Sequence, residues 1–344
     1  MTNQLSIVPL REITPGLIDL ESLSSNLDSS LSKLAGKKVF FRSDYSKESV
    51  PLENLESSPR TCPYEIRNFS PESRDRKVIG IDSSCALIGE TEDGSIFAGR
   101  VAVVCATKSK ILTYYRAGPF VFYLTMKYLS EELRNVLPSR SVRAIASDTS
   151  LAERYIRTRL ERSAQIFSAQ SNNDSIILID GAIRSSLLET KEFSLRQLER
   201  TAESNSNAIL GIGKTSCLKV VSNAANLLQS VGKSGNYFDI TESVKVFSPR
   251  FESRVLVARF CQNSRVFRVD ASRTNFEEDS QVLSDLKQND VMFRGYPETL
   301  RLAHHLAVFD SSTISSTRSF LSRKYRLIHI PSDDMRATIL GKLV

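Results

Sequence analysis

The chain has 344 residues, 41% of them hydrophobic, which is enough for one large domain or two smaller ones with real cores. Lys and Arg total 46 against 39 for Asp and Glu, so the net charge is +7. This mild excess is compatible with a polyanionic partner but does not establish one.

The five cysteines form no CxxC pair and are odd in number, which argues against a disulfide framework and a zinc cluster. With three histidines, a His-rich metal site is also excluded. The N-terminus lacks the pattern of a signal peptide, and the apolar stretches near residues 101–106 and 118–125 are too short to span a bilayer. We therefore expect a cytoplasmic protein that has no membrane partner.

Residues 1–76 differ in character from the rest of the chain. Leucines at helical spacing predict a helix over residues 17–36 that ends at Gly36. Residues 56–77 hold three prolines and many charges, which is typical of a surface loop. We expect residues 1–76 to form a mainly helical N-terminal extension.

The pattern changes to strands at Lys77. Strands are predicted over residues 77–84, 96–107 and 111–118, with a turn at the Asp-Gly pair between the first two. Short links between consecutive strands favour an antiparallel meander. A helix over residues 123–137 is expected next.

From residue 149 the pattern predicts alternating helices and strands. The helices are expected over residues 149–170, 194–205, 216–231 and 296–310. The short apolar runs 175–180 and 208–213 read as strands buried on both faces, and residues 254–260 and 265–270 read as a hairpin. Together these elements indicate an α/β protein with a ribonuclease H-like mixed sheet flanked by helices, formed by residues 77–344.

Two of the predicted strands end in an aspartate. Asp82 follows the apolar run Val-Ile-Gly-Ile, and Asp180 ends the run Ile-Ile-Leu-Ile before Gly181. Either residue alone would be explained as a turn former. In a fold with adjacent strands, the two carboxylates would lie near each other, and a divalent cation relieves the repulsion between such groups.

A third acid could come from the helix that precedes Asp180. It offers Glu153 and Glu161, which point in directions only about 80° apart because they are eight residues apart. Glu161 is the favoured candidate because it is nearer in sequence to the strand. The alternative is a solvated charge paired with Arg157 or Arg162.

The segment Gly-Tyr-Pro-Glu-Thr-Leu-Arg-Leu-Ala-His-His adds Tyr296, His304 and His305. Near a metal site, a tyrosine and a histidine can orient a phosphate, bind the metal or move protons. Adjacent helical residues face about 100° apart, so at most one of the two histidines is functional. Ordinary packing is the alternative for both.

Lys214 follows the strand over residues 208–213 within Gly-Lys-Thr, which resembles the end of a P-loop. Ala208 stands where that motif requires glycine, and the intervening residues are those of a strand, so we reject a P-loop. Lys214 could still bind a substrate phosphate as a point charge.

Taken in order, these segments resemble the NurA nuclease family. The match covers roughly residues 77–310: the strand ending at Asp82, the helix bearing Glu161, the strand ending at Asp180, the Gly-Lys-Thr-Ser strand end, and the Gly-Tyr-Pro to Ala-His segment. The chain departs from the family in having Asp-Ser-Ser and Asp-Gly-Ala where Asp-Gly-Ser is common.

The resemblance implies a nuclease that depends on Mn²⁺ or Mg²⁺. Family members form homodimers, degrade DNA from 5′ to 3′, cut single strands and work with the hexameric HerA translocase in resecting DNA ends for recombinational repair. By this resemblance the catalytic residues are Asp82, Glu161, Asp180, Tyr296 and His304. All of these except Tyr296 are expected metal ligands.

The mechanism we expect is metal-assisted hydrolysis of a phosphodiester, since coordination lowers the pKa of water. Two rival hypotheses remain. One is a non-catalytic nucleic-acid-binding module of the same fold; the other is a ribonuclease or resolvase-type nuclease, because fold alone does not select the substrate.

Overall fold

A long antiparallel meander forms one half of the sheet. In the computed structural model, which describes residues 32–36, 38–40, 64–133, 136–214, 218–247 and 252–330, it consists of β3 (Lys77–Glu90), β4 (Gly94–Thr107) and β5 (Lys110–Thr125). The turn predicted between β3 and β4 is present, closed by a bond from Thr91 N–H to the Gly94 carbonyl. All three strands are longer than predicted.

Shorter strands continue the sheet from the other edge of β3. β6 (Ser175–Asp180) pairs with β3 in parallel, and β7 (Ala208–Gly213) pairs with β6 in parallel. Both have the predicted bounds, and both are almost wholly buried, as apolar strands covered on two faces should be.

The remaining strands run antiparallel beyond β7. β10 (Phe267–Ala271) pairs with β7, and β9 (Arg254–Arg259) pairs with β10, which confirms the predicted hairpin. β8 (Asn236–Asp239) and β2 (Arg67–Asn68) complete this side. The result is the predicted mixed sheet, in which parallel and antiparallel pairs adjoin.

Further along β3, the edge that pairs with β6 has a stretch without a partner strand among the described residues. β6 covers Lys77 to Ile81, and β1 (Lys38–Phe40) returns to the same edge only at Glu90. β1 in turn pairs with β13 (Ile328–Ile330). In the described residues, no strand therefore pairs with this edge of β3 between Asp82 and Gly89.

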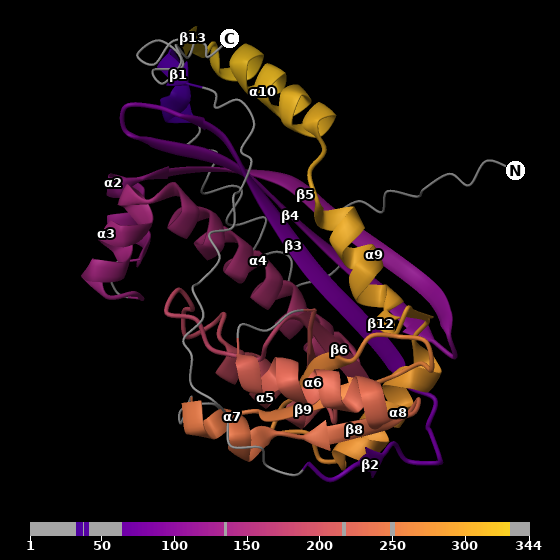
Figure 1. Ribbon diagram of the computed structural model, residues 1–344. Helices are drawn as coiled ribbons and strands as arrows, with labels where there is room; N and C mark the ends of the chain where they lie inside the picture. Colours follow the sequence, from indigo (N-terminus) through magenta and orange to yellow (C-terminus); the bar gives the residue numbers. More distant parts are fainter. Residues whose placement is uncertain are drawn as a thin grey trace, which may run out of the picture.

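Helices cover both faces of the sheet (Figure 1). On one face α4 (Thr149–Ser171) packs on β3, next to α5 (Leu195–Ser204). The other helices on this face are α2 (Met126–Leu133), α3 (Ser139–Ser147), α6 (Lys219–Val231) and α7 (Thr241–Phe247). Helix α4 begins where Asp148 accepts hydrogen bonds from the N–H groups of Ser150 and Leu151.

The opposite face is covered by α8 (Asp279–Asn289), α9 (Glu298–Ala307) and α10 (Ser311–Tyr325). A two-stranded hairpin of β11 (Met292–Phe293) and β12 (Tyr296–Pro297) leads into α9. Figure 1 shows α9 and α10 following one another along the long strands, on the side opposite α4.

Glycine at position 80 lets α9 contact the sheet directly. A Cβ atom there would lie 2.5 Å from the backbone carbon of Thr299 and 2.6 Å from the nitrogen of Leu300. No side chain fits in that space, so Gly80 sets how closely α9 approaches β3.

The N-terminal region matches the prediction only partly. Much of the helix predicted over residues 17–36 lies outside the described residues, which include one turn of 3₁₀ helix, η2 (Ser32–Leu34). β1 and β2 also belong to residues 1–76 and join the main sheet, because their backbones pair with strands of the core. The domain boundary at residue 77 stays a prediction.

Candidate metal centre

Asp82 lies within β3 and does not end it, which corrects our expectation of a strand end. β3 continues to Glu90 because β4 pairs with it throughout, with Asp82 opposite Ala102. What ends here is the parallel partner β6, whose last partner on β3 is Ile81. Asp82 is 3% exposed, and its Oδ1 accepts a hydrogen bond from Ser83 N–H at 2.8 Å.

Asp180 does end its strand, as predicted. Gly181 follows with φ +105°, a conformation that favours glycine, and donates its N–H to the Ile212 carbonyl. Alternation along β6 places Asp180 on the same face as Ile176 and Leu178, toward α8 and α9. Alternation along β3 places Asp82 on this face as well, beyond Val78 and Gly80.

His304 reaches the two carboxylates from α9. Its Nδ1 lies 2.7 Å from Oδ2 of Asp82. His305 points elsewhere, with its Nε2 lying 3.4 Å from a guanidinium nitrogen of Arg301. Of the two histidines, His304 is thus the one that lies beside Asp82, and its functional role stays a prediction.

Tyr296 and Lys214 both bind Asp180. The Tyr296 hydroxyl donates to Oδ1 at 3.0 Å, and Lys214 Nζ donates to Oδ2 at 2.9 Å. Lys214 also lies over the Tyr296 ring, 5.1 Å from its centroid. Burial, followed by the negative charge of Asp180, raises the pKa of Tyr296 above its ordinary value, so the phenol remains a donor.

Three of the predicted metal ligands converge. One ligand atom each from Asp82, Asp180 and His304 lies within 4.8 Å of the others. Carboxylate oxygens suit Mg²⁺ and Mn²⁺, and a neutral imidazole adds a ligand that first-row transition metals accept. The donor set therefore fits a divalent cation of the expected kind.

Glu161 approaches from the opposite face and is not part of that group. Its Oε2 accepts from the Ser83 hydroxyl at 3.2 Å, and its Oε1 accepts from the Gln165 amide at 3.0 Å. Ser83 alternates with Asp82 and thus faces α4. Burial, followed by the nearby Asp82 charge, raises the pKa of Glu161 to about 7, against the opposing effects of Arg162 and Arg157.

An open cleft connects Glu161 with Asp180. We call it the α4 cleft: a space of about 820 Å³ between α3, α4, the end of β6 and the loop after Asp180. Glu161 and Asp180 both line it, whereas Glu153 does not. The pairing of β3 with β6 ends after Ile81, at this level of the sheet. Glu161 from one face of the sheet and Asp180 from the other therefore lie near the same opening.

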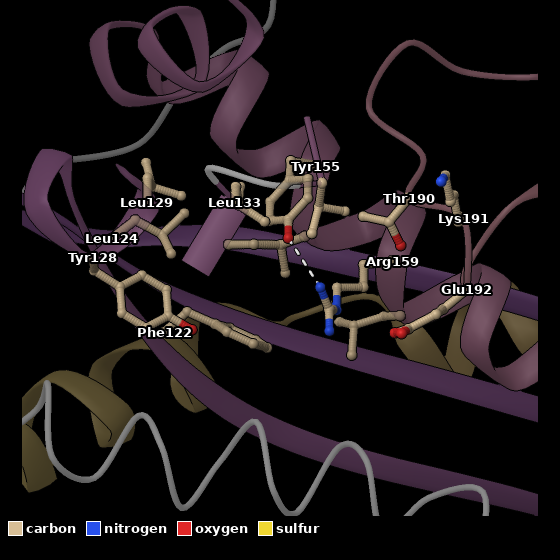
Figure 2. Close-up of a pocket in the computed structure, with 13 residues that line it drawn as sticks. Phe122, Leu124, Tyr128, Leu129, Leu133, Tyr155, Arg159, Thr190, Lys191 and Glu192 are labelled. Atoms are coloured by element: carbon tan, nitrogen blue, oxygen red, sulfur yellow. Dashed lines mark hydrogen bonds between the residues drawn. The ribbon is translucent and has the colours of Figure 1, made fainter. Parts of the chain in front are cut away.

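A second pocket is separate from these residues. It encloses about 300 Å³ between the end of β5, α2 and α4, and apolar side chains such as Leu129 and Ile156 line much of it. Figure 2 shows Arg159 at this pocket, donating to the Tyr155 hydroxyl at 3.1 Å. None of the candidate metal ligands lines it.

Three residues of the site region were not singled out from the sequence. Gly80 admits α9, Ser83 binds Glu161, and Gln165 holds the other oxygen of Glu161. The glycine within an otherwise apolar strand was a usable signal, because such a glycine often marks close backbone approach. Ser83 and Gln165 gave no such signal.

No helix in the described part of the chain has both the length and the apolar character that crossing a bilayer would require. A comparison with curated proteins gives no significant match.

Solved structures that are similar to this chain at low identity include three nucleases. The NurA nuclease from Sulfolobus solfataricus is 14% identical, with a TM-score of 0.46 over 76% of this chain and 87% of that one. A NurA structure bound to dAMP and manganese is 9% identical, with a TM-score of 0.41 over 71% and 87%. Endonuclease V from Bacillus subtilis is 13% identical, with a TM-score of 0.33 over 72% and 83%. The model of the NurA domain matches residues 76–309, more than half of the sequence, and the chain therefore belongs to the NurA family.

Proposed function

We propose that this chain is a metal-dependent nuclease that hydrolyses phosphodiester bonds in DNA. The observation that carries the proposal is the convergence of Asp82, Asp180 and His304 from three separate segments of a NurA domain. A cluster of three ligand atoms within 4.8 Å is explained poorly by turn formation or by surface charge, and well by a cation site.

The residues take the following roles. Asp82, Asp180 and His304 hold a divalent ion, Mn²⁺ or Mg²⁺, and Glu161 is a further ligand from the other face of β3. When bound, the ion supplies positive charge to the phosphoryl group and lowers the pKa of water. Tyr296, kept protonated by its raised pKa, donates a hydrogen bond to the substrate phosphate or to Asp180.

Lys214 would contact a phosphate of the substrate. Its Nζ lies 2.9 Å from Oδ2 of Asp180. With a cation held at Asp180, the ammonium group of Lys214 would be available as a point charge for a substrate phosphate. Positioning and charge supply most of the catalysis in phosphoryl transfer, and Lys214 would add its positive charge to that of the bound ion.

Family membership supports the finer details of the proposal. The activity is that of a 5′–3′ exonuclease and single-strand endonuclease, acting in DNA end resection for homologous recombination with a HerA-type hexameric translocase. The chain works in the cytoplasm as a homodimer, with residues 77–344 as the nuclease domain and residues 1–76 as an extension.

Labelled single-stranded DNA and RNA, incubated with Mn²⁺ and the purified chain, test this function. We expect cleavage of DNA, and a loss of about 100-fold or more in Asp82→Asn and Asp180→Asn. Asp75→Asn is the matched control, because Asp75 makes an exposed pair with Lys108. Cleavage that survives in Asp82→Asn would refute the site, and preferred cleavage of RNA would identify a ribonuclease.

Thermal unfolding gives a second readout that does not require activity. Mn²⁺ should raise the melting temperature of the unsubstituted chain, since a ligand that binds only the folded state stabilises it. Asp180→Asn should abolish this shift, and Asp75→Asn should retain it. DNA binding without cleavage, together with no shift by any divalent metal, would favour a non-catalytic binding module.

A further inference from the structure

The α4 cleft extends well beyond the metal ligands. Its wall on α4 runs from Leu151 to Gln165, with Glu161 near one end. Ten residues separate Leu151 from Glu161, so the cleft continues for about 15 Å along the helix from this carboxylate. At about 3.4 Å per nucleotide of a stacked strand, this length matches roughly four phosphates.

The cleft carries positive charge on three of its walls. Arg140 projects from α3, Arg154 from α4 and Arg184 from the loop that follows Asp180. All three are exposed, and none of them makes an ion pair within the part of the chain that the structure describes.

Some other arginines of this protein have carboxylate partners. Arg162, which also lines the cleft, binds Glu189 at 2.8 Å, and Arg254 binds Asp279 at 2.8 Å. The remaining acids of the cleft are Glu161 and Asp180, both proposed metal ligands that a bound cation would neutralise. Among the described residues, three guanidinium groups of the cleft thus have no carboxylate partner and are available to an anionic ligand.

We propose that the α4 cleft binds a single nucleic-acid strand on one side of the cleaved phosphate, with Arg140, Arg154 and Arg184 contacting its phosphates. This proposal rests on the nuclease function proposed above. Over about 15 Å of cleft, a duplex whose major groove alone is about 12 Å wide and about 8.5 Å deep takes up more space than the cleft's volume of about 820 Å³, so a single strand fits better. Guanidinium groups suit phosphate oxygens, and such contacts position a strand without reading its sequence.

Binding is measured with a fluorescent oligothymidylate of about twelve nucleotides, within the usual range of single-strand sites. The Asp82→Asn chain serves as background, so that the strand is not cut. Arg140→Ala, Arg154→Ala and Arg184→Ala should each weaken binding by about two- to fivefold. Each should also reduce the slope of log K against log salt concentration by about 0.7.

Arg143→Ala is the matched control. Arg143 is exposed on the same helix as Arg140 but does not line the cleft. Its substitution should leave both affinity and salt slope unchanged. The proposal is overturned if the three cleft variants keep the salt slope of the background chain, or if Arg143→Ala lowers it equally.

Cleavage of long and short substrates separates this proposal from the function on which it rests. In the chain with intact Asp82, the arginine variants should raise KM for the long oligonucleotide by a larger factor than KM for a dinucleotide. A dinucleotide is too short to reach along the cleft. Failure of the unsubstituted chain to cut either substrate would refute the nuclease function. The salt slopes of binding would still show whether the arginines of the cleft contact the strand.

Discussion

The imidazole Nδ1 of His304 lies 2.7 Å from Oδ2 of Asp82, although the two residues are 222 positions apart in the sequence. The contact depends on how closely α9 lies on β3, because Asp82 is fixed within the strand and His304 within the helix. The half-exposed imidazole thus joins a carboxylate that is almost fully buried. A cation bound here would have to coordinate both side chains or replace the contact between them.

His304→Ala should lower kcat by about 10²–10⁴-fold, the range for loss of a group that acts directly in proton transfer or metal binding. His305→Ala is the control on the same helix, since His305 lies beside Arg301 and not beside the carboxylates. Steady-state cleavage of labelled DNA at several Mn²⁺ concentrations measures both variants. Equal losses in the two variants would contradict the assignment.

Gly80→Ala should lower the free energy of unfolding by about 1–3 kcal/mol, because its Cβ would overlap the Thr299 backbone and push α9 away from β3. Activity should fall as well, since the same shift moves His304 from Asp82. Gly213→Ala is the comparison: the three atoms nearest to its Cβ would all belong to the Arg268 side chain, at 3.5–3.8 Å. Its stability should change by less than about 1 kcal/mol in urea unfolding.

Tyr296→Phe should reduce activity without altering the alkaline side of its pH profile. The raised pKa of Tyr296 means that the phenol stays protonated throughout the neutral and mildly alkaline range. Its loss removes a hydrogen-bond donor to Asp180 and no titrating base. A pH profile of kcat/KM from about pH 6 to about pH 10 compares the two chains. Loss of an alkaline transition in the variant would show that Tyr296 ionises.

Asp290 should make the stability of this protein depend on pH. It is almost fully buried where α8 leads toward α9, and it accepts hydrogen bonds from the N–H and hydroxyl of Thr299. Burial raises its pKa to about 7, so the folded chain binds a proton that the unfolded chain releases near pH 4. The contribution of this proton to the free energy of unfolding is present at low pH and is lost as pH rises through about 7.

Asp290→Asn tests that dependence. The amide remains uncharged at every pH, and the Thr299 hydroxyl can reverse to accept from it, since a hydroxyl both donates and accepts. Relative to the unsubstituted chain, the variant should gain free energy of unfolding between about pH 5 and about pH 8. Urea unfolding at both values measures the difference. A difference that does not change with pH would contradict the raised pKa.

Local sequence patterns were sufficient for the short central strands. β6 and β7 have the predicted bounds because each is a wholly apolar run bounded by turn residues. The meander was predicted in order but too short, since Asp82 and Ser83 are polar yet lie within a strand that pairing with β4 extends to Glu90. The elements that were not predicted are helices α3, α7, α8 and α10 and strands β1, β2, β8, β11, β12 and β13.

The candidate ligands were also visible in the sequence, but their arrangement was not. Asp82, Asp180 and His304 converge as expected, whereas Glu161 reaches the region from the other face through Ser83. Lys214, expected at a phosphate, binds Asp180 here. These contacts join distant segments, so local periodicity carries no information about them.

The sequence by itself determined which residues carry charge at the ends of apolar runs, and where Tyr296 and His304 lie on either side of a helix start. Only the tertiary structure decided that Asp82 stands in mid-strand, at the level where the neighbouring strand β6 ends. It also decided that His304 rather than His305 meets this carboxylate. The physical reason is that the side chains of adjacent residues on a strand or helix point in different directions. Which of these side chains joins the site depends on which distant element packs against that face.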